Sequence, residues 1–320
     1  MTEQSTPLFD LSGKRVWVAG HRGMVGSALV RRLASENCEV LTVGRDTVDL
    51  RRQAMVERWM KKTVPDVVFV AAAKVGGIVA NDTWPADFLY DNLAIQTNII
   101  ETARQIKVRK LIFLGSSCIY PRLAPQPMQE GALLTGSLEP TNQWYAIAKI
   151  AGIMLCQAYR RQHDLDFISA MPTNLYGPAD NFDLISGHVI PALIAKAHAA
   201  KLDPEAQIIV WGSGSPRREF LHVDDLADAL VFLMKYYSDG EHVNVGVGRD
   251  MTINELAHLI ADIVGVKAKL RFDSTKPDGT PQKLLDSSNL MAIGWKPRIG
   301  IERGLRDTYA WFLENVASAH

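Results

Sequence analysis

Five short segments of this chain are apolar at nearly every position, and sequences with helical spacing separate them. These segments are residues 14–20, 39–43, 67–73, 110–114 and 167–171. A strand that is apolar throughout, rather than at every second residue, is buried on both faces, as in a parallel sheet with helices on each side. The pattern therefore predicts an α/β chain with a doubly wound, Rossmann-type parallel sheet.

Apolar residues at helical spacing predict four helices among these strands. They are residues 24–36, a helix that Asp49 caps and that runs to about residue 62, residues 89–106 and residues 143–161. After Gly177 the rhythm changes. The elements expected there are a helix at 188–200, a strand at 207–211, a polar turn at 212–218, a helix at 223–236, a strand at 242–247, and a helix that begins with the capping box of Thr252 and Glu255 and ends near Gly265.

This change of rhythm predicts two closely joined domains. We expect residues 1–176, joined again by 220–247, to form a dinucleotide-binding domain. Residues 177–219 and 248–320 should form a smaller C-terminal α/β domain that binds the substrate. A length of 320 residues lies near the upper limit for a single core. The crevice between the domains is the expected ligand site.

The charge balance argues against a nucleic-acid or membrane-surface binder, because the 35 basic and 35 acidic residues cancel. Anionic ligands must then be held by local charges. The first ten residues lack the pattern of a signal peptide, and no apolar stretch is long enough to cross a bilayer. Cys38, Cys118 and Cys156 are too far apart for a secreted disulfide framework, and no metal-ligand spacing is found. We therefore expect a cytoplasmic protein without a metal.

A glycine-rich loop follows the first predicted strand and precedes the first helix. It consists of Gly20, His21, Arg22, Gly23, Met24, Val25 and Gly26. Glycine allows a tight turn and a close approach to a pyrophosphate, whose charge the helix N-terminus stabilises. The loop therefore predicts a dinucleotide site.

The end of the second strand indicates which dinucleotide is bound. An acidic residue there would bind the ribose of NAD, but this chain has Arg45, and Arg22 lies in the glycine loop. Two guanidinium groups suit the 2′-phosphate of NADP. The alternative is that Arg45 is a solvated surface charge and Asp46 is the ribose ligand.

Three residues form a candidate proton-transfer centre. Tyr145 and Lys149 are four residues apart on a predicted helix, so their side chains share a face. An ammonium group near a phenol should lower the pKa of the tyrosine from about 10. Ser116 follows the fourth strand, where open α/β sheets carry out their chemistry, and could bond a substrate carbonyl oxygen. The order of loop, serine, tyrosine and lysine is that of short-chain dehydrogenases.

Longer runs make the resemblance more specific. The chain resembles the GDP-L-fucose synthases, a family of extended short-chain dehydrogenases/reductases. The runs that carry the resemblance are Gly-Ser-Ser-Cys-Ile-Tyr-Pro at 115–121, residues 138–151, Met-Pro-Thr-Asn-Leu-Tyr-Gly-Pro at 171–178, and Arg-Glu-Phe-Leu-His-Val-Asp-Asp at 218–225. The likeness covers nearly the whole chain and is weakest before residue 14, between residues 196 and 207, and after residue 284.

The resemblance implies a two-stage reaction on GDP-4-keto-6-deoxy-D-mannose. Carbons 3 and 5 are epimerised, and NADPH then reduces the ketone at carbon 4. Ser116 and Tyr145 would polarise the carbonyl. The family assigns the base and the acid of the epimerisations to the positions of Cys118 and His188, while Tyr145 protonates the carbon-4 oxygen and Lys149 binds the nicotinamide ribose. Cys118 alone would more often be a small buried apolar residue, and His188 alone a surface or capping histidine.

The same resemblance implies the binding residues and a homodimer. Beyond the glycine loop and four of the catalytic residues, Ser116, Tyr145, Lys149 and His188, the expected cofactor contacts are Arg45, Asp46, Asp49, Leu50, Leu114, Gly115, Ser117, Pro172, Thr173, Asn174 and Leu175. The expected substrate contacts are Lys196, Trp211, Arg218 and Asp278. Lys196 and Arg218 suit a pyrophosphate, Trp211 offers a flat apolar face, and Asp278 can accept bonds from hydroxyl groups. The helices at 89–106 and 143–161 would pair across a two-fold axis; the alternative is that their apolar surface is wholly intramolecular core.

Other functions remain compatible with parts of this pattern. A GDP-L-colitose synthase, which epimerises carbon 5 only and reduces a 3-deoxy substrate, would carry the same motifs. A sugar 4,6-dehydratase would usually have an acidic residue beside the catalytic hydroxyl, where Ser117 and Cys118 follow Ser116. A simple 4-epimerase would hold NAD tightly and need neither Cys118 nor His188. A nucleotide-sensing protein of this fold commonly loses the tyrosine or the lysine, and both are present here.

Overall fold

The centre of the protein is a six-stranded sheet in which every strand pair is parallel. The structure is a computed structural model that describes residues 6–184, 186–203, 206–267 and 269–319. From one edge to the other the strands are β2 (Glu39–Leu41), β1 (Arg15–Ala19), β3 (Val67–Val70), β4 (Lys110–Leu114), β5 (Asp166–Pro172) and β9 (Val243–Val245). The predicted doubly wound α/β fold is confirmed. Because the strand order reverses beside β1, a ligand crevice is expected at the carboxyl ends of β1 and β3.

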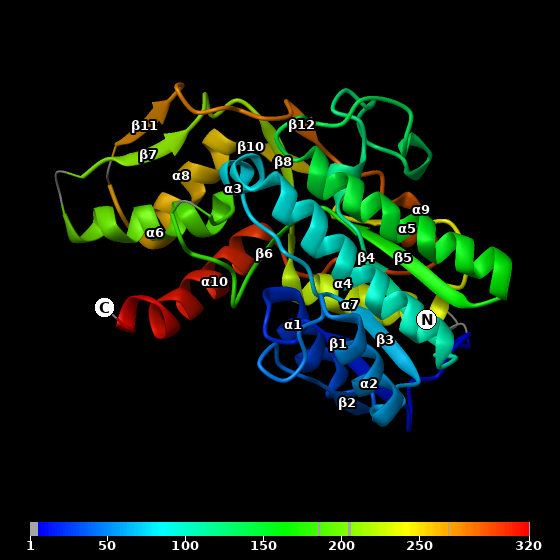
Figure 1. The fold of residues 1–320 in the computed structure, drawn as a ribbon. Coiled ribbons are helices and arrows are strands. Elements are labelled where there is room, and N and C mark those ends of the chain that lie inside the picture. Colours follow the sequence, from blue (N-terminus) through cyan, green and yellow to red (C-terminus); the bar gives the residue numbers. More distant parts are fainter. Residues whose placement is uncertain (1–5, 185, 204–205, 268, 320) are drawn as a thin grey trace.

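Alternate residues of these strands build two hydrophobic cores, one on each face of the sheet. Val18, Phe69, Ile112 and Ile168 form one row across four strands and pack against α1 (Met24–Leu33) and α7 (Val223–Tyr236). The residues that alternate with this row point to the opposite face of the sheet and pack against the helices there. These helices are α2 (Gln53–Thr63), α4 (Pro85–Gln105) and α5 (Gln143–His163). Figure 1 shows α4 and α5 lying side by side. Burial on both faces explains why the strands are apolar throughout.

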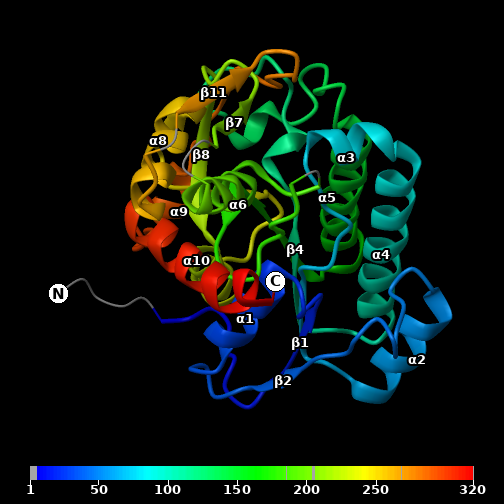
Figure 2. The ribbon, with the colours of Figure 1, turned by 90° about the vertical axis from the view of Figure 1, so that its left-hand side faces the viewer.

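A second lobe is built around a third hydrophobic core. Its helices are α6 (Val189–Leu202), α8 (Ile253–Val264) and α10 (Ile301–Asn315). One small sheet contains β6 (Asn174–Tyr176), β8 (Arg217–His222), β10 (Asp250–Thr252) and β12 (Gln282–Lys283), and another pairs β7 (Ile208–Trp211) with β11 (Leu270–Asp273). In Figure 2, α6, α8 and α10 lie on the side of the molecule opposite α4. The lobe thus forms a separate wall beside the central sheet.

Two expectations about local structure are wrong. Residues 212–218 are not a turn throughout, because β8 begins at Arg217 and pairs with strands on both sides. Asp49 does not cap the following helix. That helix begins at Gln53, and the Asp49 carboxylate instead accepts hydrogen bonds from Arg51. The capping box of Thr252 and Glu255 is present as expected.

Several short elements lacked a recognisable periodicity in the sequence. They are α3 (Ile78–Thr83), α9 (Ser288–Ala292), β6, β10, β12 and the 3-10 turns η1 (Ser117–Ile119), η2 (Glu130–Ala132) and η3 (Ala317–Ala319). Within the described ranges, none of the helices combines the length and apolarity that a bilayer crossing requires.

Candidate functional site

A cleft of about 930 Å³ runs between the central sheet and the second lobe. One end is lined by the glycine loop and the segment after β2, and the middle by the ends of β3, β4 and β5. The far end is lined by α6, β7 and β8 of the second lobe. This volume suits a ligand of the size of a cofactor and a substrate together. The cleft is therefore the candidate active site.

The glycine loop has the geometry that the sequence predicted. Gly20 follows β1 with a φ of +90°, and a Cβ atom there would meet the Cα of Ala72 at 2.8 Å. Gly23 donates its N–H to the Gly20 carbonyl at 3.0 Å, and α1 begins at Met24. All seven loop residues line the cleft, so the N-terminus of α1 faces it. This is a ready-made position for a pyrophosphate.

Two arginines flank the same end of the cleft. Arg22 and Arg45 both line it, whereas Asp46 does not. Asp46 instead pairs with Arg22 at 3.3 Å, and both side chains are exposed. An ion pair in water contributes little to stability, so Arg22 is free to exchange Asp46 for a phosphate. This arrangement favours a phosphate-bearing ribose over the alternative in which Asp46 binds the ribose.

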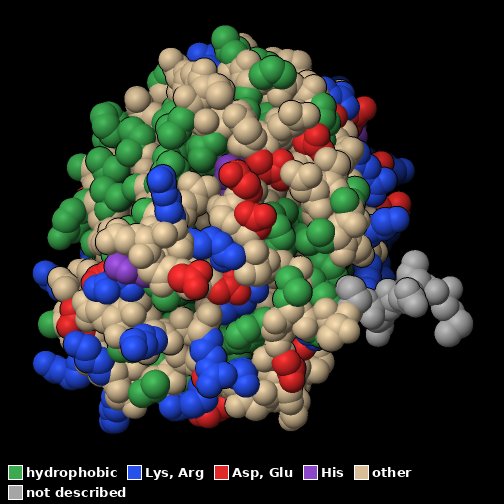
Figure 3. All heavy atoms as spheres, turned by 90° about the vertical axis from the view of Figure 1, so that its right-hand side faces the viewer, with side chains coloured by type: hydrophobic (Ala, Val, Ile, Leu, Met, Phe, Trp, Pro, Cys, Tyr) green, Lys and Arg blue, Asp and Glu red, His purple; other side chains and the backbone are tan. Residues whose placement is uncertain are grey.

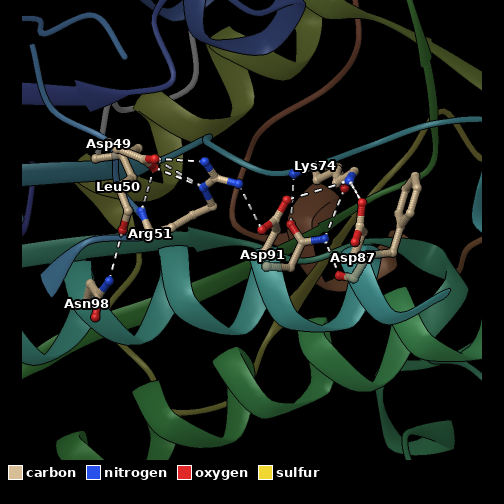
Figure 4. Close-up of polar contacts among 9 residues, drawn as sticks. Asp49, Leu50, Arg51, Lys74, Asp87, Asp91 and Asn98 are labelled. Carbon is tan, nitrogen blue, oxygen red and sulfur yellow. Dashed lines mark hydrogen bonds and ion pairs between the residues drawn. The ribbon is translucent and has the colours of Figure 1, made fainter. Parts of the chain in front are cut away.

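The segment after β2 is tied to α4 by a chain of polar contacts (Figure 4). Arg51 makes a two-pronged contact with Asp49 and reaches Asp91 on α4 at 3.3 Å. Asn98, also on α4, donates to the carbonyl of Leu50 at 3.0 Å. The hydrogen bonds from Arg51 lower the pKa of Asp49 to about 2. Asp49 and Leu50 are therefore held in a fixed conformation where they line the cleft.

Ser116 and Cys118 lie where β4 ends at the middle of the cleft. Ser116 is the N-cap of η1, and its hydroxyl oxygen accepts hydrogen bonds from the N–H of Cys118 at 3.4 Å and from its thiol at 3.1 Å. Cys118 is 7% exposed, yet it lines the cleft. The serine hydroxyl and the thiol thus form one contiguous polar group facing a ligand.

Tyr145 and Lys149 share one face of α5, as predicted. The ammonium of Lys149 lies 5.7 Å from the centre of the Tyr145 ring and donates a hydrogen bond to the carbonyl of Leu114 at 2.7 Å. Burial lowers the pKa of Lys149 to about 8. Our expectation that Lys149 lowers the pKa of Tyr145 is wrong here. Burial raises the pKa of Tyr145, ionisation of the neighbouring Cys118 would raise it further, and a hydrogen bond with Ser116 opposes both effects.

His188 reaches the cleft from the second lobe. It precedes the first turn of α6, and its carbonyl accepts the N–H of Ala192 at 3.1 Å. Its imidazole is open to the cleft but surrounded by protein, and this burial lowers its pKa. Neutral imidazole is therefore favoured in the unliganded protein near neutral pH. His188 and Cys118 thus come from different lobes and face the same space.

The far end of the cleft gathers the four predicted substrate residues. Trp211 is 38% exposed, and the ammonium groups of Lys196 and Lys276 lie 4.8 and 5.3 Å from its ring centre. Arg218 donates to the main-chain carbonyl of Asp278 at 3.2 Å, and burial lowers the pKa of Arg218 to about 10. The Asp278 carboxylate accepts two hydrogen bonds from Ser213 at 2.7 and 2.8 Å. Cations and an aromatic face therefore meet at this end.

Most predicted residues line the cleft, and three do not. Leu114 and Lys149 are buried behind it, and Asp46 is an exposed side chain that does not line it. Lys283 and Glu139 also line the cleft, and neither was predicted as a site residue. Lys283 is the neighbour of Arg218 across the β8–β12 pair, and burial lowers its pKa. Lys283 lies beside Arg218 because two strands from distant parts of the chain pair, and this pairing places a second positive charge at the cleft. Of the described residues, no group of three or more His, Cys, Asp or Glu is placed to hold a metal ion.

The fold and the cleft define a nucleotide-binding α/β protein with a tyrosine–lysine pair at its centre. The chain belongs to the NAD dependent epimerase/dehydratase family, whose model matches residues 16–246.

Individual relatives resemble the chain over nearly its whole length. It is 58% identical over 311 residues to the GDP-L-fucose synthase of Sinorhizobium fredii (strain NBRC 101917 / NGR234), which is 97% of this chain and 99% of that protein. It is 53% identical over 315 residues to the GDP-L-fucose synthase of Escherichia coli (strain K12), covering 95% and 98%. The crystal structure of a GDP-L-fucose synthetase from Naegleria fowleri bound to NADP matches with a TM-score of 0.89 at 28% identity, covering 98% of both chains.

Proposed function

We propose that this protein is an NADPH-dependent enzyme that converts GDP-4-keto-6-deoxy-D-mannose to GDP-L-fucose by 3,5-epimerisation and 4-reduction. The observation that carries the proposal is the meeting of two lobes at one cleft. Ser116, Cys118 and Tyr145 line it from the sheet side, and His188 lines it from the other side. The near-full-length likeness to GDP-L-fucose synthases supports the same conclusion.

The residues at the glycine-loop end fit NADP(H). The N-terminus of α1 would hold the pyrophosphate, and Arg22 and Arg45 would pair with the 2′-phosphate. Asp49 and Leu50 would border the adenosine, while the residues from Pro172 to Leu175, at the ends of β5 and β6, would border the nicotinamide. When bound, the cofactor supplies the hydride for the reduction.

The first task of the site is to make the sugar protons acidic. Carbons 3 and 5 both flank the ketone at carbon 4, so donors at the carbonyl oxygen stabilise the enolate that forms when either proton leaves. The hydroxyl groups of Ser116 and Tyr145 are those donors. A high pKa of Tyr145 keeps the phenol protonated, which is the form that can donate.

Epimerisation also needs proton transfer on opposite faces of the sugar ring. Cys118 would act from the sheet side and His188 from the second lobe, one removing a proton and the other returning one. The serine hydroxyl that accepts from the Cys118 thiol keeps the sulfur at the cleft surface.

The reduction requires a proton at the carbon-4 oxygen as hydride arrives at the carbon. Tyr145 gives that proton from the position in which it already bonds the oxygen. Lys149 lies behind the tyrosine ring, and its positive charge would offset part of the cost of the phenolate left by the transfer, although burial keeps the pKa of Tyr145 raised overall. The family resemblance also assigns Lys149 a contact with the nicotinamide ribose, for which its ammonium would have to turn from the Leu114 carbonyl toward the cleft.

The far end of the cleft would hold the GDP. Arg218 and Lys283, neighbours on paired strands, suit the pyrophosphate, and Trp211 offers its ring to an apolar face of the ligand. Lys196 donates to the carbonyl of Ile209 and lies over the Trp211 ring. We therefore propose that Lys196 contributes to the shape of this end of the cleft as well as to its positive charge.

We further propose that the protein is a cytoplasmic homodimer that binds no nucleic acid. Large apolar side chains are exposed along the outer faces of α4 and α5, and Figure 3 shows hydrophobic side chains gathered on that side. Trp144, Ile147 and Met154 follow helical spacing on α5, and Tyr90 lies on α4. Such a patch marks an interface.

Light scattering should give the mass of two chains, and Ile147→Glu should give that of one. A wild-type monomer would contradict the dimer.

The enzymatic proposal is tested with two synthetic keto-sugars. NADPH oxidation should depend on GDP-4-keto-6-deoxy-D-mannose, with a kcat/KM at least tenfold above that for the 3-deoxy analogue. A preference for the 3-deoxy sugar would make the protein a GDP-L-colitose synthase. Tight binding of NADPH with no turnover of either sugar would support a nucleotide sensor instead.

A further inference from the structure

A hydrogen bond crosses the cleft between the two lobes beside the proposed acid. The N–H of Gly77, on the connection after β3, donates to the carbonyl of Ser186 at 3.0 Å. Ser186 lies two residues before His188 on the second lobe. Gly76, Gly77, Gly187 and His188 all line the cleft, so this contact, which we call the Gly77–Ser186 bridge, spans the candidate active site.

The sheet-side end of the bridge is fixed by Asn81. This side chain is 6% exposed, comes from α3 and lines the cleft. Its amide nitrogen donates to the carbonyls of Gly76 at 2.7 Å and of Gly77 at 3.0 Å. The approach of the lobes is close, because a Cβ atom on Gly77 would meet the Gly187 carbonyl oxygen at 2.8 Å. A change in Asn81 therefore acts on the backbone that touches the second lobe.

The base of the same segment is anchored at Lys74 (Figure 4). Asn92 of α4 accepts the N–H of Lys74 at 2.9 Å and donates to its carbonyl at 3.0 Å. The ammonium of Lys74 pairs with Asp87 at 2.6 Å and with Asp91 at 3.6 Å. The connection after β3 is thus held at Lys74 and again at Asn81, with Gly76 and Gly77 between the two anchors.

The other end of the bridge is fixed by a polar loop of the second lobe. Ser186 donates both its N–H and its hydroxyl to the carboxylate of Asp183, at 2.7 and 2.8 Å. Asn181 donates its amide to the Ser186 hydroxyl at 3.0 Å. The N–H of Gly187 donates to the Asp183 carbonyl at 2.9 Å, which closes the turn that leads into His188. These hydrogen bonds fix the position of Ser186, and the position of Ser186 in turn constrains that of the His188 imidazole two residues later.

We propose that Asn81 and Asn181 are positioning residues for His188. They fix the two ends of the Gly77–Ser186 bridge, and the bridge sets the place of the imidazole relative to Cys118 on the opposite lobe. This inference rests on the proposed function, because it assigns His188 a role in proton transfer.

The physical reason is that the two proton-transfer groups belong to different lobes. Cys118 is fixed to the sheet through η1, whereas His188 starts a helix that packs into the third core. Their separation therefore depends on contacts between the lobes. A displacement of about 1 Å in such a group can cost on the order of 100-fold in rate. The reduction, which uses Tyr145 and Lys149 of one lobe, does not depend on that separation.

The test compares Asn81→Ala and Asn181→Ala with wild type, using the intact enzyme. Exchange of the carbon-3 and carbon-5 protons with D2O is followed by NMR in the presence of NADP⁺, and hydride transfer from NADPH is measured on the already epimerised ketone. Both variants should slow proton exchange by about 10- to 100-fold and change hydride transfer by less than about threefold. The dissociation constant for NADPH should stay within about twofold of wild type.

A double-mutant cycle asks whether Asn81 acts through His188. If it does, adding Asn81→Ala to His188→Asn causes no further loss of proton exchange. Fully multiplicative losses would overturn the proposal, as would an equal fall of exchange and hydride transfer. If Asn81→Ala fails to fold, the same cycle with Asn181→Ala decides.

Gln157→Ala is the matched control, because Gln157 also donates an amide hydrogen bond to a glycine carbonyl, that of Gly240 at 3.1 Å, away from the cleft. It should leave both stages unchanged. A wild-type enzyme that neither exchanges nor reduces the keto-sugar would overturn the proposed function and this inference together. An active wild type with unselective variants would overturn the inference alone.

Discussion

The two walls of the cleft are built in different ways. On the sheet side, Ser116 follows a strand end and Tyr145 begins a helix, so regular elements of one core fix both. On the second lobe, His188 follows a polar loop, and Arg218 and Lys283 meet only where two short strands pair. Both stages use the second lobe to hold the substrate, but we infer that the proton transfer of reduction uses the sheet wall alone, whereas the proton transfers of epimerisation use both walls. The variants below test that difference.

The largest effect should come from Tyr145→Phe. Removing the phenolic oxygen takes away both the carbonyl donor and the proton source, while the ring still packs edge-on against Phe88. We expect reduction of the epimerised ketone to fall by about 10²–10⁴-fold with little change in thermal stability. Stopped-flow NADPH oxidation measures this. Reduction within a few-fold of wild type would remove Tyr145 from the mechanism.

Cys118→Ser should separate the two stages. The hydroxyl retains the size of the thiol and can still donate to Ser116, but it is a far weaker base at neutral pH. Proton exchange at carbons 3 and 5 should fall by about 100-fold, and hydride transfer to the epimerised ketone by less than about threefold. Equal losses in both stages would contradict the assignment of the thiol to epimerisation.

Arg45→Ala should act only at the cofactor end. Losing a charge-assisted contact with the 2′-phosphate should weaken NADPH binding by about 10- to 100-fold, corresponding to roughly 1.5–3 kcal/mol, and leave NADH binding unchanged. Fluorescence titration with both cofactors measures this. Arg58→Ala, on the exposed surface of α2, is the control. Equal weakening of both cofactors would place Arg45 away from the 2′-phosphate.

The pH dependence of reduction should report Lys149. Burial lowers the pKa of this group to about 8, so its charge is present below pH 8 and is lost as the pH rises through that value. Reduction should fall about tenfold per pH unit above pH 8 if the charge is required. In Lys149→Arg, which stays charged, this descending limb should move above pH 10. An unchanged limb in the variant would assign it to another group.

The sheet wall could be predicted from the sequence because its residues follow periodic elements. Continuous apolar strands and a glycine loop located the dinucleotide end, and the spacing of Tyr145 and Lys149 located the centre. The helices of the second lobe at 188–200 and after Thr252 were also predicted, but most of its proposed substrate-binding residues lie on short strands and loops that lack such periodicity. Lys196, Trp211 and Asp278 were reached through family resemblance, and Lys283 was missed because its partner Arg218 is 65 residues away in sequence and joins it through a two-residue strand.

Errors in the prediction have a common physical cause. Asp49 was expected to cap a helix, and Lys149 to lower the pKa of Tyr145. In each case the tertiary surroundings prevail: Arg51 takes the Asp49 carboxylate, and burial of the phenol raises the pKa of Tyr145. Polar partners and burial both depend on tertiary contacts, which single-sequence spacing does not contain.

The most direct test of the account is the product of one complete turnover in D2O. With unlabelled NADPH and GDP-4-keto-6-deoxy-D-mannose, proton NMR should show GDP-L-fucose carrying deuterium at carbons 3 and 5 and protium at carbon 4. That labelling requires proton transfer by groups on both walls of the cleft and hydride transfer from NADPH at the sheet wall. A product reduced at carbon 4 with protium still at carbons 3 and 5 would contradict the account.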